Sequence, residues 1–329
     1  MDILSALMDP GINIAVQNIS PAVTQAFALA GELDSMPWYL FILSIVYLGF
    51  HPRSGARLSV LVGICVGFNE ALKLAWHMPR PYWISQAVQV FENHSSFGFP
   101  SGGAMIGAVM YGYIALTVRR MWVILSCMLL LVSVCLARIF IGAHFVLDII
   151  GGLGFGFLLL LVFFLTEPHI EKVAAGLSRP SRWIGIVVLS FLPLLLVLPA
   201  YLSLASWQVP AAWIEIARMH TGSTIHPVTI QFAWDAMGII LGCLAGYEVL
   251  SSYGGWEPPA NLLQRIVVAM VGAASVLVGY ACTVTIKSAL SAPFSQGLSV
   301  LCLAAVLFWL ACGVPLIARR AGIGLRIEH

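Results

Sequence analysis

The stretch ARIFIGAHFVLD, from Ala137 to Asp148, lies between two long apolar segments and carries an arginine, a histidine and an aspartate. The flanking segments, 121–141 and 145–165, are each long enough to cross the hydrocarbon core of a bilayer as a helix. A charged group at the middle of a membrane costs several kcal/mol. We therefore expect this stretch to lie at a membrane surface, where its polar residues have a chemical task.

The whole sequence has the composition of a membrane protein. Hydrophobic residues make up 60% of the 329 residues, and charged residues only 9%. The hydropathy pattern predicts about nine transmembrane helices, so the expected fold class is an all-α, polytopic integral membrane helical bundle. The expected spans are 36–51, 57–76, 100–118, 121–141, 145–165, 183–205, 229–250, 264–286 and 294–317.

The distribution of basic residues predicts the orientation of the bundle. Cytoplasmic loops are enriched in Lys and Arg, and all but five of the sixteen basic residues fall on one side of the expected spans. The five on the other side are Lys73, Arg80, Arg138, Arg218 and Lys287. The N-terminus is then outside and the C-terminus inside. The outer face would meet the periplasm of a bacterial inner membrane, or the lumen of an endoplasmic reticulum membrane.

Three consecutive segments are expected to differ in role. Residues 1–35 form an outer-face segment whose apolar positions recur at roughly helical spacing, so an interfacial helix or a frayed tail is expected there. Residues 36–165 hold the core helices and all the chemistry-bearing stretches. Residues 166–329 add transmembrane helices of unknown role. Basic residues interleaved with aromatic ones do not occur outside the short loops, which argues against a nucleic-acid partner.

His144 and Asp148 are four residues apart, so on a helix that starts near His144 the two side chains share a face and can touch. A carboxylate hydrogen-bonded to one imidazole nitrogen fixes the tautomer and leaves the lone pair of the other nitrogen pointing outward. Such a histidine can attack phosphorus. The structural alternative is a helix-start histidine with an aspartate one turn later, which for this pair alone is the more frequent case.

Three cations accompany this pair. The guanidinium of Arg138 presents a planar fork that matches phosphate oxygens. Lys73 and Arg80 lie at the end of the second expected span, where Pro79 and Pro81 break the helix. Two cations seven residues apart can converge on one dianion. Taken singly, each cation could instead be an interfacial residue whose charged end reaches toward lipid headgroups.

The stretch FPSGGA at 99–104 predicts a helix start that binds an anion. A helix start presents free backbone N–H groups and a positive dipole end, and Gly102 and Gly103 allow close approach of a phosphate. Ser101 can add its hydroxyl group. Read alone, this is a serine N-cap after a proline, which is common. Read together, the three stretches predict one phosphate pocket on the outer face.

These stretches resemble the signature motifs of the type 2 phosphatidic acid phosphatase superfamily: K-x6-R-P from Lys73, P-S-G from Pro100 and R-x5-H-x3-D from Arg138. That superfamily comprises metal-independent membrane phosphatases acting on lipid phosphates and diphosphates, with glucose-6-phosphatase as a relative. The resemblance implies no metal and no cofactor. It also implies that the partners are membrane lipids and a phosphorylated lipid or small phosphorylated substrate.

The resemblance further implies a role for each matching residue. His144 is expected to be the nucleophile that forms a phosphohistidine, and Asp148 its orienting partner. The implied phosphate-binding residues are Lys73, Arg80, Ser101, Gly102 and Arg138. The triplet PYW at 81–83, together with nine spans and an outward N-terminus, is more similar to the glucose-6-phosphatase branch than to six-span lipid phosphatases.

The chain departs from the family pattern at Gly103, where the superfamily has a histidine. That histidine is the general acid that protonates the departing oxygen, a step worth about 10²–10⁴ in rate. Three explanations stay open: a deliberate replacement that leaves the phosphate binders intact, another acid such as His94 or His77, or a substrate with a good leaving group such as a diphosphate.

The sequence therefore favours an integral membrane phosphatase that hydrolyses a lipid phosphate or a polyprenyl diphosphate at the periplasmic or lumenal face. One alternative is a glucose-6-phosphatase-like hydrolase of a sugar phosphate. Another is a non-catalytic phospholipid or phosphate binder, or a transporter. For a transporter, Asp235, Glu248 and Lys287 in or beside the later spans would mark a polar pathway.

Overall fold

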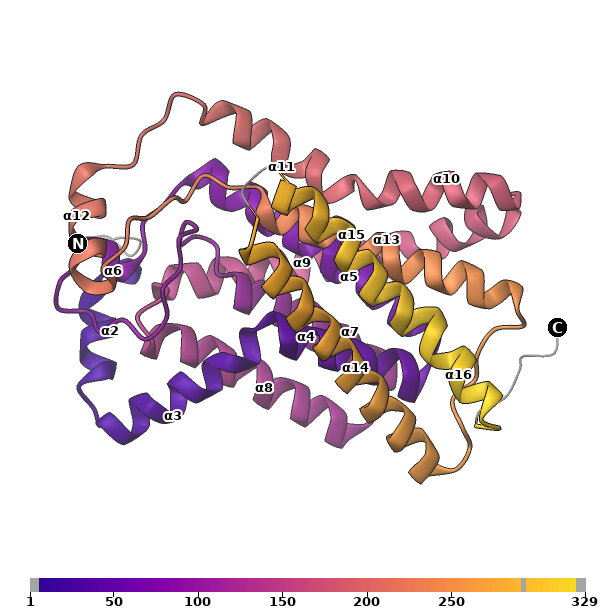
Figure 1. Cartoon of the computed structure of the whole chain (residues 1–329). Coiled ribbons are helices and arrows are strands. Elements are labelled where there is room, and N and C mark those ends of the chain that lie inside the picture. Colours follow the sequence, from indigo (N-terminus) through magenta and orange to yellow (C-terminus); the bar gives the residue numbers. More distant parts are fainter. Residues whose placement is uncertain (1–5, 291–293, 324–329) are drawn as a thin grey trace. The chain divides into compact units, whose positions relative to one another are not determined.

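The computed structural model describes residues 6–290 and 294–323 (Figure 1). Every regular element of these residues is a helix, which confirms the all-α expectation. The first five residues of the expected N-terminal segment lie outside the described residues, as do 291–293 and 324–329 of the C-terminal one.

The chain folds into two compact units that interleave along the sequence. As far as the residues are described, unit 1 combines Met1–Ser35, Cys65–Thr166 and Leu196–Ile230, and unit 2 combines Met36–Ile64, Glu167–Leu195 and Gln231–His329. All of the expected site residues belong to unit 1. The functional division at residues 35 and 165 stays a prediction.

Unit 1 contains the helices that surround the expected site and parts of three helices that it shares with unit 2. Its elements are α2 (Pro10–Gln17), α3 (Pro21–Gly31), the 3₁₀ helix η1 (Glu32–Asp34), α6 (Pro81–Ile84), α7 (Gly102–Val118), α8 (Met121–Phe140) and α12 (Ala211–Thr221). The elements that it shares with unit 2 are α5 (Pro52–Trp76), α9 (Val146–Gly176) and α11 (Leu192–Ser203).

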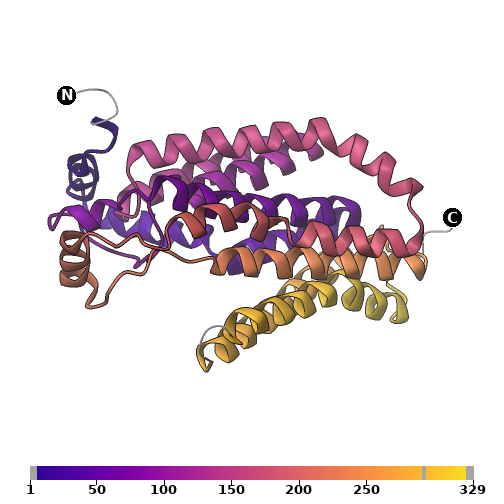
Figure 2. The ribbon, with the colours of Figure 1, turned by 90° about the horizontal axis from the view of Figure 1, so that it is seen from above.

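Unit 2 is built mainly from long helices of the C-terminal half. Its own elements are α4 (Met36–Ser44), the π-helix η2 (Ile45–Phe50), α10 (Arg179–Ser190), α13 (Gln231–Ser252), α14 (Leu262–Ser288), α15 (Phe294–Phe308), the π-helix η3 (Trp309–Gly313) and α16 (Val314–Arg320). In this unit α13 packs along α15, as the orange and yellow helices of Figure 2 show.

Seven helical segments of the described residues are long and apolar enough to cross a membrane. They are Pro52–Ile84, Met121–Phe140, Val146–Gly176, Arg179–Ser203, Gln231–Ser252, Leu262–Ser288 and Phe294–Arg320. An eighth results if Pro21–Asp34 and Met36–Phe50, which meet at a bend of 57°, count as one span. The expected number of nine is thus confirmed only in part, and the orientation stays a prediction.

Two of the nine expected spans differ from the rest. The expected span 36–51 is the second arm of the bent pair, and its sixteen residues are too few to count as a crossing helix by themselves. The expected span 100–118 is α7, which has 17 residues and is shorter than the other candidates. A helix of 17 residues is at the lower limit for crossing a bilayer.

Glycines on α9 set its distance from α7. A Cβ added to Gly152 would lie 2.6 Å from the carbonyl oxygen of Ser101, and one added to Gly156 would lie 2.7 Å from that of Met105. Small residues four apart allow two membrane helices to approach backbone to backbone. The close approach brings the starts of both helices together, since the amide of Ser101 donates to the carbonyl of Asp148 at 2.9 Å.

The N-terminal segment docks on unit 1 through polar side chains. Asn13 and Gln17 are the buried residues of α2. The Nδ2 of Asn13 donates to the carbonyls of Ile139 and His144 at 2.9 and 3.0 Å. The Nε2 of Gln17 donates to the carbonyl of Phe140 at 2.8 Å. These contacts fix the segment against the turn that follows α8, while α3 lies along α8 itself (Figure 1).

Replacing Gln17 by alanine should lower thermal stability. The side-chain amide pairs with both backbone groups of Gln89, at 2.9 Å each, and with the carbonyl of Phe140. Leaving the buried carbonyl of Phe140 without this partner costs about 1–3 kcal/mol, and the loss of the two bonds to the exposed Gln89 costs less. The measurement is the unfolding temperature in detergent, with Asn18→Ala on the exposed side of the same helix end as control. An equal unfolding temperature for both variants would contradict the docking.

Candidate active site

The turn between α8 and α9 brings His144 back to the end of α8. Gly142 has a φ of +73°, a conformation that side chains disfavour, and a Cβ there would lie 2.6 Å from the carbonyl oxygen of Gln89. The amide of His144 then donates to the carbonyl of Arg138 at 3.2 Å. The glycine therefore places the histidine within one turn of the arginine.

His144 and Asp148 make the contact that their spacing predicts. The Nδ1 of His144 lies 3.1 Å from Oδ2 of Asp148, and the same oxygen accepts a hydrogen bond from the amide of Phe145 at 3.0 Å. The helix begins at Val146 rather than near His144, so the histidine lies just before the first turn. The carboxylate reaches back to it as a cap on the helix start.

The opposite nitrogen of the ring faces an arginine. The Nε2 of His144 lies 3.2 Å from Nη1 of Arg80. Because a guanidinium N–H only donates, Nε2 must carry the lone pair and Nδ1 the proton, which it donates to Asp148. Burial lowers the pKa of His144 well below its usual value, and the charges of Arg80 and Lys73 lower it further. The imidazole is therefore neutral near pH 7.

The two cations of the first motif lie beside His144 on an extended segment and on α5. Arg80 donates from Nε to the carbonyl of Ser96 at 2.7 Å and from Nη1 to that of Ala143 at 2.9 Å. The Nζ of Lys73 donates to the carbonyl of Phe97 at 2.7 Å. Both cations are buried. Neutral carbonyl groups hold the two side chains in place and leave their positive charge available to an anion.

The second motif forms a helix start, as its sequence predicts. Ser101 is the N-cap of α7, and its Oγ accepts from the amide of Ala104 at 3.5 Å. Gly102 is the first residue of the helix, and the Nδ2 of Asn69 donates to the carbonyl of Pro100 at 3.2 Å. Structure and sequence agree on a helix N-terminus beside the His–Asp pair, where an anion is favoured.

Arg138 is held by two carboxylates that the sequence analysis did not identify. Its Nη1 lies 3.0 Å from Oε2 of Glu92 and 3.3 Å from Oδ2 of Asp34, and its Nη2 donates to the carbonyl of Gly31 at 2.7 Å. Arg138 is 2% exposed. A buried guanidinium needs such partners. No spacing rule links residues 34, 92 and 138, so only the tertiary fold reveals the group.

Glu92 and His94 form a coupled pair in the loop before α7. Burial alone would raise the pKa of Glu92, but the hydrogen bond from His94 and the charge of Arg138 bring it down to about 2. Burial and the charge of Arg80 lower the pKa of His94 to about 4. His94 is thus neutral near pH 7 and a poor proton donor. This weakens its prediction as an alternative general acid.

His77, the other alternative acid, packs among aromatic rings. Its ring centre lies 6.2 Å from that of Phe97 and 5.6 Å from that of Trp207. The ring of Phe97 also lies 5.4 Å from Trp207 and 6.4 Å from Trp83. Residues of the later segment, 196–230, therefore build one wall of the unit that carries the motifs.

Gly103 is enclosed by the carboxylate of Asp34. A Cβ added at position 103 would overlap Oδ2 of Asp34 and lie 2.9 Å from its Oδ1. A side chain at position 103, such as the histidine that the resemblance implies, therefore has no room while Asp34 keeps this position. The same space is filled from η1, in the N-terminal segment.

The polar residues of unit 2 that could mark a transport pathway, Asp235, Glu248 and Lys287, each have a partner of opposite charge. Lys287 lies 3.3 Å from Oδ2 of Asp235, whose Oδ1 also accepts from Oγ of Ser299 at 2.8 Å. Glu248 lies 3.3 Å from Arg182. Pairing inside a bundle gives these residues a structural role, which weakens the transporter alternative.

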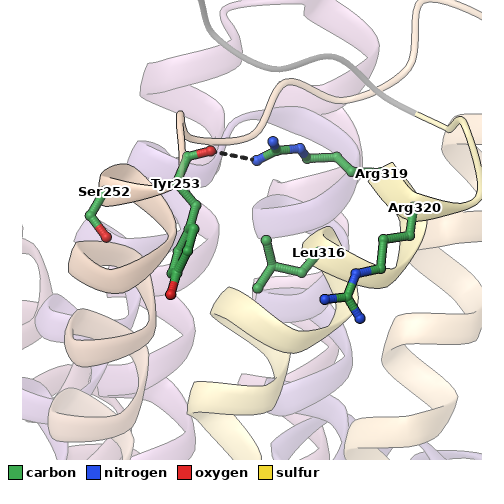
Figure 3. A pocket seen from close by; sticks show the side chains of 5 residues that line it. All are labelled: Ser252, Tyr253, Leu316, Arg319 and Arg320. Carbon is green, nitrogen blue, oxygen red and sulfur yellow. Dashed lines mark hydrogen bonds between the residues drawn. The ribbon is translucent and has the colours of Figure 1, made fainter.

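Unit 2 also contains an open pocket, lined by Ser252, Tyr253, Leu316, Arg319 and Arg320 (Figure 3). The Nη1 of Arg319 donates to the carbonyls of Tyr253 and Gly255, both at 3.0 Å. None of the motif residues lines this pocket, and its titratable groups offer no nucleophile paired with a base.

The arrangement in unit 1 is suited to a phosphate group, in a chain made of membrane-crossing helices. Comparison with protein families agrees with this. Residues 54–171 match the PAP2 superfamily, and residues 234–326 match the transmembrane extension of PAP2 superfamily phosphatases. The chain therefore belongs to the PAP2 superfamily and is an integral membrane protein, as the resemblance of its motifs implies. No solved structure matches it.

Individual relatives support the same family. Phosphatidylglycerophosphatase B of Bacillus subtilis is 36% identical over 103 residues, which are 28% of this chain and 49% of the relative. Sphingosine-1-phosphate phosphatase 1 of Mus musculus is 31% identical over 147 residues, or 42% and 34%. The chain thus spans less than half of either relative. Glucose-6-phosphatase 2 of Homo sapiens is 27% identical over 262 residues, or 65% and 71%.

Replacing Gly103 by alanine should displace Asp34 and destabilise the fold. The added methyl group overlaps a carboxylate that is also bound to Arg138, and overpacking of this kind costs about 1–3 kcal/mol. The control is Gly154→Ala on α9, where an added Cβ meets nothing within 4 Å. Combining Gly103→Ala with Asp34→Gly should restore part of the unfolding temperature. Equal unfolding temperatures for the two alanine variants would contradict the close approach.

Proposed function

We propose that the protein is a phosphatase that removes a phosphate group from a membrane lipid through a phosphohistidine at His144. The observation that carries the proposal is the orientation of this imidazole. Its Nδ1 is held by Asp148 at 3.1 Å, while the lone pair on Nε2 faces Arg80 at 3.2 Å, inside a group of buried cations. A neutral histidine with a fixed tautomer is a competent nucleophile.

The residues around His144 supply what phosphoryl transfer needs. Catalysis of this reaction consists mainly of positioning and of stabilising charge on the phosphoryl oxygens. Lys73, Arg80 and Arg138 provide positive charge, and the start of α7 provides backbone N–H groups. When Nε2 bonds to phosphorus the ring becomes cationic, and Asp148 stabilises that cation. Water then releases phosphate from the histidine.

A lipid phosphate is the substrate class that the relatives favour. Two of them are named for phosphatidylglycerophosphate and sphingosine 1-phosphate hydrolysis. Lys73, Arg138 and Asp148 lie on segments long and apolar enough to cross a membrane, so a lipid can present its headgroup from within the bilayer. A polyprenyl diphosphate would present its headgroup from the bilayer in the same way. We place the site on the periplasmic or lumenal face from the bias of basic residues.

A sugar phosphate is the second candidate substrate. It is favoured by the extent of the match to human glucose-6-phosphatase 2, which covers 65% of this chain and 71% of that protein. The purified protein in detergent should therefore be given a lipid phosphate and glucose 6-phosphate in competition. Faster phosphate release from the lipid supports the first candidate, and preferential release from the sugar supports the second.

Replacing His144 by asparagine should abolish turnover. Removing a nucleophile of this kind lowers kcat by about 10³-fold or more. Mass spectrometry of protein denatured at alkaline pH during turnover should find the phosphoryl group on His144 in the unmodified protein and not in the variant. His169→Asn, an exposed position on α9, is the matched control. Turnover by His144→Asn at the rate of this control would rule out the proposed nucleophile.

The pH profile of kcat should reflect the depressed pKa of His144. Burial and the neighbouring positive charges lower this pKa, so the imidazole stays neutral as the pH falls through 6.5, the usual histidine value. We therefore expect kcat to hold its plateau from pH 7 down through 6.5 and to fall only in more acidic solution. The measurement is kcat for p-nitrophenyl phosphate at saturating substrate. An acidic midpoint at or above pH 6.5 contradicts this assignment.

A further inference from the structure

The carboxylate of Asp34 lies where the family pattern places the side chain of residue 103. Gly103 itself contributes no side-chain atoms to that volume, and both carboxylate oxygens of Asp34 would be in contact with any Cβ built at position 103. Gly103 and the placement of the Asp34 carboxylate are complementary, because a histidine side chain at position 103 would exclude that carboxylate. The structure thus offers an ionisable group at the position from which the family delivers a proton.

Asp34 reaches this position from η1, which ends the N-terminal segment. Its Oδ2 lies 3.3 Å from Nη1 of Arg138, and its side chain is 13% exposed. The anchors at Asn13 and Gln17 hold the segment in place. The carboxylate is therefore fixed beside a phosphate-binding arginine and beside the N-terminus of α7, on the same unit as His144.

Asp34 belongs to a group of buried and half-buried charges around His144. The buried cations of this group are Lys73, Arg80 and Arg138, and its carboxylates are Asp34, Glu70, Glu92 and Asp148. A phosphate dianion bound among these groups is attracted by the cations but repelled by the carboxylates, and protonation of one carboxylate relieves that repulsion. Asp148 is engaged by His144, and Glu92 by both His94 and Arg138. Asp34 is paired with Arg138 as well, and among these carboxylates it is the one whose oxygens lie next to Gly103.

We propose that Asp34 is a catalytic residue, the general acid that takes the place of the histidine absent at position 103. This inference rests on the proposed phosphatase function and adds to it the source of the leaving-group proton. It also explains why the chain can keep the expected phosphate-binding residues without the expected histidine at position 103. Neither His94 nor His77 then has to donate the proton to the leaving group.

The proton balance of the first step is complete. The protein takes up one proton from solvent on Asp34 when the phosphate dianion binds. The Nε2–P bond then forms as the bond between phosphorus and the departing oxygen breaks. The proton moves from the Asp34 carboxyl group to that oxygen, and the alcohol leaves. The products are a phosphorylated imidazolium and the Asp34 carboxylate. The imidazolium keeps the proton on Nδ1, where it is hydrogen-bonded to Asp148.

The second step regenerates both groups. The Asp34 carboxylate removes a proton from water as the water oxygen bonds to phosphorus and the Nε2–P bond breaks. The products are hydrogen phosphate dianion, neutral His144 and protonated Asp34. Acid and base roles thus alternate on one residue, as microscopic reversibility requires of a double displacement.

The test is the dependence of Asp34→Asn on the leaving group. With a lysophosphatidic acid, whose departing alkoxide is strongly basic, kcat should fall about 10²-fold or more. With p-nitrophenyl phosphate, whose phenolate leaves without protonation, it should fall less than about tenfold. The aryl ester also reports that the variant is folded. Glu32→Gln, an exposed position on the same η1, is the matched control and should leave both rates unchanged.

A second variant exchanges the two acids. Gly103→His combined with Asp34→Ala places the family histidine in the vacated volume, and should recover part of the rate on the lysophosphatidic acid that Asp34→Ala loses. Gly103→His alone should not exceed the unmodified protein, because Asp34 occupies the space. No recovery in the double variant, with the aryl ester still hydrolysed, would count against the proposal.

Each outcome bears on a different claim. Equal losses on both esters with Asp34→Asn overturn the acid role. An increase on both esters also overturns it, because Asp34 would then be a competitor of the phosphate group. If the unmodified protein hydrolyses neither ester, the proposed phosphatase function fails, and the role of Asp34 fails with it.

Discussion

The burial of positive charge in a bundle of apolar helices is the constraint on which the rest of unit 1 depends. Arg138 is 2% exposed, and its guanidinium is stable there only because carboxylates and a carbonyl surround it. Asp34 and Glu92 come from segments far away in sequence. The need to neutralise one arginine therefore dictates how the N-terminal segment and the loop before α7 are placed, and with them the walls of the site.

Backbone contact between helices supplies the second requirement, which is precision. Gly152 and Gly156 let α9 approach α7 until the amide of Ser101 reaches the carbonyl of Asp148 at 2.9 Å. The start of α7 and the residue that holds His144 are thus joined through main-chain atoms, which move less than side chains do. Gly142 adds the reversal that returns His144 to the end of α8.

The parts of the site that could be predicted from the sequence are those set by local geometry. His144 and Asp148 are one helical turn apart, and Ser101 with Gly102 begins a helix, so spacing and capping rules suffice for both. Asp34 could not be found in this way, because its contact with Arg138 spans the fold. Of the nine expected spans, 100–118 is a helix of only 17 residues, and hydropathy does not register the break near residue 35 that makes 36–51 one arm of a bent pair. The glycine at position 103, where the resemblance implies a histidine, was the signal in the sequence that pointed to the surroundings of Asp34.

The position of Asp34 has a consequence for how such sites diversify. The stretch that matches the superfamily begins at residue 54, so this carboxylate lies on a segment that the shared signature does not contain. An ionisable group beside the signature residues can then be gained, lost or repositioned by changes in the segment that precedes the matching stretch. Two proteins with the same signature motifs can thus differ in reactivity through residues that lie outside those motifs.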